Sequence, residues 1–231
     1  MTLNYSFISH RKDTLMLHTI KIATNKSTGM FPEAQRVAAK RHLKKFLNAM
    51  PEGTEAYIAG GAPRDWHHGW GCRDVDIFFK VPDDFNSLND AYKHLSQFKV
   101  MGEAYGVDYS YGCGEQGILT IHEYPIHQGS LRYRKVQLIR LKKSPLDIIN
   151  NFPINMSHIW MDSAGRITCN HHYQHGYDTS ILRNVNDSQY YYPYLEKILP
   201  RMSKYAFVPN TWDGRNAVSD PIVVEEVTNV E

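Results

Sequence analysis

The sequence has few cysteines, no long apolar run and little net charge, and each of these absences excludes a class of protein. Its three cysteines, Cys72, Cys113 and Cys169, are odd in number and far apart, so they form neither a disulfide framework nor a zinc motif. Residues 1–17 lack the apolar core of a signal peptide, and no window resembles a transmembrane helix. The formal net charge of +2 does not by itself indicate nucleic-acid binding. We therefore expect a cytoplasmic protein without membrane contact and without an evident obligate protein partner.

Residues 57–79 predict a strand, a glycine turn, a short helix and a second strand. Residues 57–59 are apolar and compatible with a strand. Gly60 and Gly61 end that run, because glycine tolerates positive φ. Pro63 suits the first turn of a helix, where its missing N–H would be unpaired in any case. The rest of the chain is organised around this stretch.

Asp74 and Asp76 alternate with apolar residues in the second strand, so they project from the same face. Two carboxylates held so close repel each other unless a cation lies between them. Mg²⁺ (or Mn²⁺), a hard ion with oxygen ligands, is the natural occupant. Backbone amides just after Gly60 and Gly61 could hold an anion beside this metal. A metal beside a phosphate pocket describes a nucleotide site.

The spacing of glycines and charged residues in this stretch is specific. The pattern consists of Gly60, Gly61, Arg64, Asp65, Gly69, Arg73, Asp74 and Asp76. It resembles the head-domain signature of the DNA polymerase β nucleotidyltransferase superfamily. The closest branch is that of CCA-adding enzymes and bacterial poly(A) polymerases, whose pattern is Gly-Gly-x-Val-Arg-Asp, a later Gly, then Asp-x-Asp. Every gap is matched, Pro63 stands where the family has Val, and the match covers about residues 35–140.

The resemblance implies transfer of a nucleoside monophosphate from an NTP to an acceptor hydroxyl, with release of pyrophosphate. It assigns catalysis and metal binding to Asp74 and Asp76. It assigns nucleotide or phosphate binding to Gly60, Gly61, Arg64 and Arg73. A surface role for Arg73 is equally compatible, and Asp65 is expected to be structural, paired with Arg64. The short chain after residue 141 favours a minimal enzyme, of antibiotic-modifying, toxin–antitoxin or phage type, over a full CCA-adding cycle. The acceptor is expected to be an RNA 3′ end such as that of tRNA, with a protein or a small molecule as alternatives.

Superfamily enzymes usually add a third carboxylate from a later, neighbouring strand. That strand best matches residues 136–140, where the corresponding position is Gln137. Three explanations stay open: two aspartates suffice, or Asp108, Glu115 or Glu123 supplies the missing oxygen, or the protein has lost turnover. In the last case it would be a catalytically inactive nucleotide- or RNA-binding module on the same fold. A different possibility is that the chain is an unrelated α/β binding protein that matches the signature by chance. In that case it would bind no NTP.

The remaining periodicity predicts an α/β (α+β) fold with a small mixed sheet flanked by helices and a short mixed C-terminal extension, and the resemblance implies that this sheet belongs to a nucleotidyltransferase head domain. Helices are expected at residues 32–48, 86–98, 146–151 and, interrupted by prolines, 187–206; residues 16–23 fit a strand or a short helix. Strands are expected at 118–124, 131–141, 154–160 and 166–170. The predicted domains are a head at 1–144 (with an N-terminal extension, 1–30), a small subdomain at 145–208 and a loosely ordered acidic tail at 209–231.

Several clusters admit a structural or a functional interpretation. The helix at 32–48 carries Arg36, Lys40, Arg41, Lys44 and Lys45. This face is either solvated or a track for a phosphate backbone. His67 and His68 are expected to be exposed. The triplet His171, His172 and His175 is expected in an exposed polar loop, because no further ligand completes a zinc site.

Overall fold

The computed structural model describes residues 2–11, 14–23, 32–83, 118–125, 135–185, 195, 198–208 and 222–225. The predicted helix at 86–98 and most of the predicted helical segment at 187–206 lie outside the described residues.

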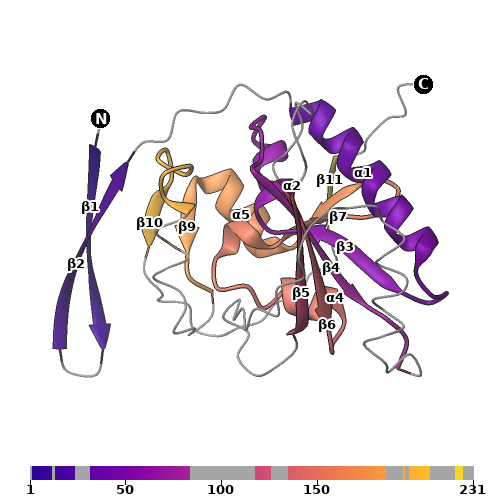
Figure 1. Cartoon of the computed structure of the whole chain (residues 1–231). Helices are drawn as coiled ribbons and strands as arrows, with labels where there is room; N and C mark the ends of the chain where they lie inside the picture. Colours follow the sequence, from indigo (N-terminus) through magenta and orange to yellow (C-terminus); the bar gives the residue numbers. More distant parts are fainter. Residues whose placement is uncertain are drawn as a thin grey trace.

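A seven-stranded mixed sheet forms the centre of the molecule, in the order β11-β8-β7-β3-β4-β6-β5 (Figure 1). Its strands are β3 (Glu55–Ala59), β4 (Asp74–Lys80), β5 (Ile118–Pro125), β6 (Lys135–Leu141), β7 (Ile159–Met161), β8 (Ile167–Cys169) and β11 (Ile222–Glu225). Within this sheet β4 and β6 pair in parallel, and the other described neighbours are antiparallel. The predicted α+β class and its mixed sheet are confirmed.

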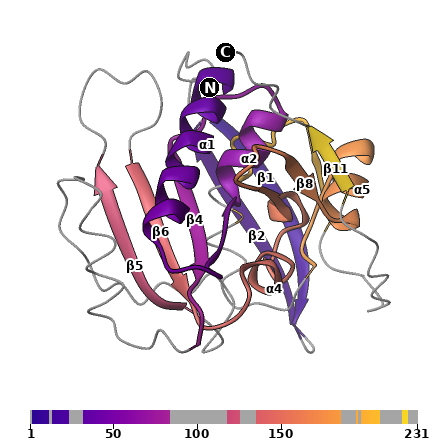
Figure 2. The same cartoon turned by 90° about the vertical axis from the view of Figure 1, so that its right-hand side faces the viewer.

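Helices cover both faces of the sheet. α1 (Pro32–Ala49) and α2 (Gly61–His67) lie on one face, and α1 lies in front of the strands in the view of Figure 2. α1 forms because apolar residues recur at helical spacing, and its Leu43 and Phe46 are fully buried in the larger core cluster. α4 (Pro145–Ile149) covers the other face, where Ile148 and Ile149 pack in a second cluster with Phe78. The two strand faces of β4 therefore point into two different environments.

The rest of the described chain forms smaller elements. These are the antiparallel hairpin of β1 (Thr2–Arg11) and β2 (Thr14–Ala23), the parallel pair β9 (Ile181–Arg183) and β10 (Ala206–Val208), the short 3₁₀-helix η2 (Asn155–Ser157) and α5 (His171–Thr179). Of the two alternatives for residues 16–23, the strand is correct. The predicted hairpin of strands 154–160 and 166–170 forms as β7 and β8, although residues 155–157 adopt the 3₁₀ turn.

The C-terminal part of the chain shares the core of the N-terminal part. Ile167 of β8 and Leu199, both fully buried, belong to the same cluster as Leu43. Within the predicted acidic tail, β11 pairs with β8, so these four residues are ordered in the sheet, contrary to the expectation of a loose tail. Pairing supplies partners for backbone groups that an isolated tail would leave to water. The described residues contain no helix of sufficient length and apolarity to cross a membrane.

Candidate active site

Asp74 and Asp76 lie on the α4-side face of β4. Val75 and Ile77 are fully buried toward α1 and α2, so strand alternation turns the two aspartates to the opposite face. Both aspartates are half-buried, which leaves them within reach of a ligand. The prediction that they share one face of one strand is confirmed.

A row of polar residues crosses the sheet beside these aspartates. Asp76 pairs with Gln137 on β6 in parallel register, and Gln137 pairs with Glu123 on β5 in antiparallel register. On the other side, Asp76 pairs with Ala59, the last residue of β3. Gln137 is 5% exposed, so its side chain is buried. β6 is thus the neighbouring strand on which the third carboxylate was expected, and Gln137 occupies the central position of the row. Two of the other candidates for the missing oxygen lie outside the described residues, namely Asp108 and Glu115.

The glycine turn leaves β3 at the level of the aspartates. Gly60 follows Ala59 directly and has φ 77° and ψ −122°, a conformation that L-residues with a Cβ rarely adopt. Gly61 opens α2, and a Cβ placed on it would lie 3.6 Å from Nη2 of Arg64. A side chain at this position would therefore be in van der Waals contact with the buried guanidinium of Arg64.

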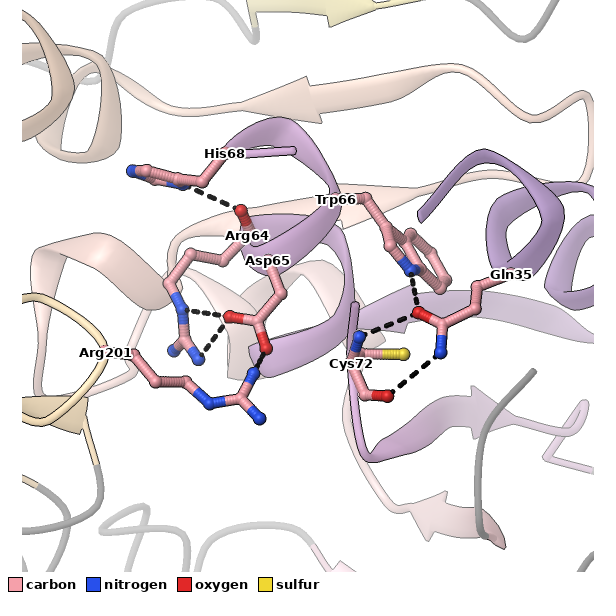
Figure 3. A network of polar contacts seen from close by, with 7 residues as sticks. All are labelled: Gln35, Arg64, Asp65, Trp66, His68, Cys72 and Arg201. Carbon is pink, nitrogen blue, oxygen red and sulfur yellow. Dashed lines mark hydrogen bonds and ion pairs between the residues drawn. The ribbon is translucent and has the colours of Figure 1, made fainter. Parts of the chain in front are cut away.

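Arg64 forms the centre of a buried charge cluster (Figure 3). Its Nε and Nη2 donate to Oδ1 of Asp65 at 3.0 and 2.8 Å, and Arg201 pairs with Oδ2 of the same carboxylate. The Asp65 side chain is 3% exposed. The predicted pairing of Arg64 with Asp65 is therefore present. Two guanidiniums on one carboxylate leave a net positive charge beside the glycine turn, and burial followed by the Arg64 charge lowers the pKa of Arg201.

Arg73 is exposed at the start of β4, next to Asp74. Its neighbour Cys72 is 1% exposed. Burial raises the pKa of the Cys72 thiol, and the charges of Asp74 and Asp76 raise it further. Cys72 is therefore a neutral buried residue, whose pKa is raised mainly by burial and further by the two carboxylates.

Gln35 and Arg201 complete this region and were missed by the sequence analysis. The fully buried Gln35 accepts from Trp66 Nε1 at 3.2 Å and from Cys72 N at 2.7 Å, and donates to Cys72 O at 3.1 Å (Figure 3). It thereby ties α1 to α2 and to the residue two places before Asp74. The sequence did contain a signal for Gln35, because it is a polar residue on the apolar side of the amphipathic helix α1. Arg201 offered no such signal, because its contact lies far away in the sequence.

The histidine pairs are in different environments from those expected. His67 and His68 are half-buried rather than exposed, with hydrogen bonds to Tyr173 Oη at 2.7 Å and Tyr205 Oη at 2.8 Å. Because imidazoles and phenols satisfy each other there, these rings can be buried without loss of hydrogen bonds.

The predicted loop at His171, His172 and His175 is also wrong, because these residues lie in α5; His175 is exposed as expected, whereas His171 and His172 are half-buried. Asn170 caps this helix by accepting from His172 N and Tyr173 N. Among the described residues no group of three His, Cys, Asp or Glu side chains is arranged to hold a metal ion.

The basic face of α1 divides into buried and exposed parts. Arg36 is 9% exposed and pairs with Glu33 at 3.3 Å, whereas Arg41, Lys44 and Lys45 are exposed. Arg36 is therefore a structural residue, and only the exposed cations are available to a polyanion.

Solved structures share this arrangement of strands and helices. The chain is similar to a Thermotoga maritima CCA-adding enzyme complexed with tRNA, with a TM-score of 0.54 and 14% identity, over 78% of this chain and 42% of that one. It is also similar to a CCA-adding enzyme in complex with CTP, with a TM-score of 0.52 and 11% identity, over 74% of this chain and 38% of that one. The chain therefore spans less than half the length of these structures. No protein-family model and no curated protein sequence matches the chain. The fold is that of a nucleotidyltransferase head domain, of the type found in CCA-adding enzymes.

Proposed function

We propose that the protein is a metal-dependent nucleotidyltransferase that transfers an NMP from an NTP to an acceptor hydroxyl. The observation that carries the proposal is the position of Asp74 and Asp76, on one face of β4 beside the Gly60 turn, in a fold of this type. In the reaction the acceptor oxygen bonds to the α-phosphorus, and the bond from that phosphorus to the oxygen bridging to the β-phosphate breaks. Pyrophosphate leaves with the electron pair, and the hydroxyl proton passes to solvent.

The donor set fits Mg²⁺ or Mn²⁺. Asp74 and Asp76 offer half-buried carboxylate oxygens, and the amide of Gln137 lies next in the row, so the ligands are hard oxygens. A divalent ion bound there supplies electrostatic stabilisation of the charge that develops on the phosphates. The two aspartates would hold the ion and orient the nucleotide against the sheet. No histidine or thiol is needed among its ligands.

The phosphates would lie along the glycine turn. Gly60 and Gly61 let the backbone approach closely, and the net positive charge of the Arg64–Asp65–Arg201 cluster attracts an anion. Asp65 holds both guanidiniums in place, so they need no reorganisation when a nucleotide binds. Arg73, exposed beside Asp74, is a further candidate phosphate contact.

For the acceptor we propose the 3′ end of an RNA. The similar solved structures contain tRNA in one case and CTP in another, and the exposed cations of α1 provide a basic surface. Because the chain spans less than half of those structures, the proposal concerns the transfer step and not the whole activity of those proteins. A protein or a small molecule remains the alternative acceptor.

The alternative function is a catalytically inactive nucleotide- or RNA-binding module on the same fold. The observation that favours it is Gln137, a neutral amide at the centre of the polar row on β6. A glutamine can accept a hydrogen bond or bind a metal through its carbonyl, but it cannot act as a base.

Both functions can be tested with one set of variants. Each α-³²P-labelled NTP is incubated with Mg²⁺, cellular RNA and the wild type, Asp74→Asn, Asp76→Asn or Asp83→Asn. Asp83 is the matched control, because it has the same chemistry but is 88% exposed and pairs with Lys80. We expect labelled RNA with the wild type and the control, and a loss of at least about a hundredfold in the other two, because several kcal/mol of stabilisation is removed. If the wild type binds NTP but transfers no label, and Asp76→Asn abolishes that binding, the binding module is favoured. Both functions would be refuted if the wild type neither transferred label to RNA nor bound NTP.

A further inference from the structure

We propose that an aromatic platform at the C-terminal end of α2 stacks the bases of single-stranded RNA a few nucleotides before its 3′ end. The platform consists of the rings of His67, His68, Trp70 and Tyr177. The proposal names a subsite for the RNA acceptor, and in that respect it rests on the proposed function. Its basis is a continuous series of partly exposed rings that buried groups hold in place, a short stretch of chain away from Asp74.

The end of α2 turns Trp70 back over His68. Gly69 N donates to Trp66 O at 2.9 Å. Trp70 N donates to Asp65 O at 2.7 Å, and the two bonds together form a Schellman motif in which Gly69, with φ +72°, takes the left-handed position. The ring of Trp70 therefore stacks on that of His68, with centroids 4.6 Å apart and planes inclined by 29°.

Tyr177 of α5 extends this series of rings. Its ring centroid lies 4.4 Å from that of His67 and 5.3 Å from that of His68. Among the residues that the structure describes, Tyr177 is the one large hydrophobic side chain that is exposed, at 37%, and the other three platform residues are half-buried. A single exposed tyrosine is ordinary, whereas adjoining aromatic rings form a patch. Such rings offer π-faces on which any base can stack.

Hydrogen bonds to buried groups orient the two histidine rings. The Arg64 carbonyl can only accept, so Nδ1 of His68 donates to it at 2.8 Å (Figure 3), and Nε2 accepts from Tyr205 Oη at 2.8 Å. Nδ1 of His67 is hydrogen-bonded to Oη of the fully buried Tyr173 at 2.7 Å. Burial lowers the pKa of His68 to about 4 and also lowers that of His67, so both rings are neutral near pH 7. The rings therefore present uncharged faces and need no reordering when a base stacks on them.

Cations near the platform favour the phosphates of such a strand. Arg201, 27% exposed, and the exposed Lys204 belong to the C-terminal segment that contacts α2 through an ion pair and a hydrogen bond. Arg73 is exposed in the connection from α2 to β4. One carboxylate, Asp178, follows Tyr177 on α5 and accepts from Gln174 Nε2 at 2.9 Å. The three cations outnumber it, so the surroundings attract a polyanion.

The platform lies close enough to the aspartates of β4 to bind the same RNA strand. Asp74 is four residues after Trp70, so their Cα atoms are at most about 14 Å apart. At an axial spacing of about 3.4 Å per nucleotide, up to about four nucleotides cover this distance. An RNA whose 3′ hydroxyl lies beside Asp74 would therefore place bases from this part of its end on the platform.

The test measures RNA binding independently of the metal site. The full-length protein is titrated into a short, unstructured, 5′-fluorescein-labelled RNA in EDTA without NTP, and binding is followed by fluorescence anisotropy. Tyr177→Ala should weaken binding at least about fivefold, because base–aromatic stacking is lost. Tyr177→Phe should bind like the wild type, because it keeps the ring. The matched control is His175→Ala, which removes an exposed ring from the same helix outside the platform.

An RNA with abasic nucleotides near its 3′ end separates stacking from attraction of the phosphates. This RNA should bind the wild type more weakly than intact RNA does, and the difference should be smaller for Tyr177→Ala, which has already lost part of the stack. Asp178→Asn should strengthen binding of both RNAs, because it removes a negative charge beside the phosphates.

The inference is overturned if the wild type binds no single-stranded RNA, if Tyr177→Ala binds intact RNA like the wild type, or if abasic nucleotides weaken both proteins by the same factor. Its failure is distinguishable from that of the proposed function. Base-dependent binding without label transfer would support the platform and refute the catalysis. Label transfer to RNA that does not depend on Tyr177 would support the catalysis and refute the platform.

Discussion

Replacement of Asp65 by Asn tests the charge cluster that holds Arg64 beside the glycine turn. Asp65 is 3% exposed and accepts two hydrogen bonds from Arg64, whose side chain is 7% exposed, and an ion pair from Arg201. Asparagine keeps the shape but removes the charge, so Arg64 is left buried without a counter-ion.

The expected cost follows from burial. Removal of one partner of a buried ion pair costs about 3–5 kcal/mol. Arg201 is 27% exposed and can turn toward water, so the lower end, ~3 kcal/mol, is expected. For a chain of this size each kcal/mol shifts Tm by about 2–4 °C, which gives a decrease of roughly 6–12 °C.

The control is Asp162→Asn, which removes a more exposed pair. Asp162 accepts from Arg166 Nε at 2.8 Å, but Arg166 is 55% exposed, so the loss should not exceed about 1 kcal/mol. The measurement is urea unfolding followed by tryptophan fluorescence and far-UV circular dichroism. If the two variants lose the same small free energy of unfolding, Asp65 does not hold the two guanidiniums and the account of the cluster is wrong. A double-mutant cycle with Arg201→Gln should give a coupling of about 1–3 kcal/mol.

Three further predictions concern Gln35, Gly176 and His158. Gln35→Leu leaves three buried polar groups without partners and should lower the free energy of unfolding by about 2–4 kcal/mol in urea titrations. A loss below about 1 kcal/mol would show that the bonds of Gln35 to Trp66 and Cys72 do not hold α1 in place. Gly176→Ala should cost about 3 kcal/mol, because its Cβ would overlap Asn155 Nδ2, whereas Gly69→Ala, strained by φ +72° but with open space around it, should cost about 1 kcal/mol. Equal costs would contradict the packing at Gly176. Burial lowers the pKa of His158 from 6.5 to about 3, so only the unfolded chain binds its proton between these values. The free energy of unfolding should therefore fall as the pH decreases from about 6.5, by about 1.4 kcal/mol per pH unit for this group. When it is measured by urea unfolding at several pH values, His158→Gln should make it depend less on pH.

The local pattern of the sequence determined the elements that form the centre of the site. The alternation around Asp76 predicts a strand with its carboxylates on one face, and the two glycines predict the turn before α2, because both features depend only on neighbouring residues. The apolar spacing of residues 32–48 predicts α1 for the same reason. These short-range signals, with the signature spacing, were sufficient for the fold class.

The tertiary structure alone decided which distant residues join the site. Arg201 pairs with Asp65 although the two residues are far apart in the sequence. The row from Asp76 to Glu123 depends on the order and register of the strands, and hydrophobic periodicity specifies neither. β11 was missed because a strand added to a sheet edge is stabilised by its partner more than by its own sequence. α5 was missed for a related reason, since its histidines have weak helix propensity and the helix depends on the Asn170 cap and on packing of Tyr173 in the core. Propensity acts between neighbours in the sequence, whereas register, burial and ion pairing act between residues that only the fold brings together.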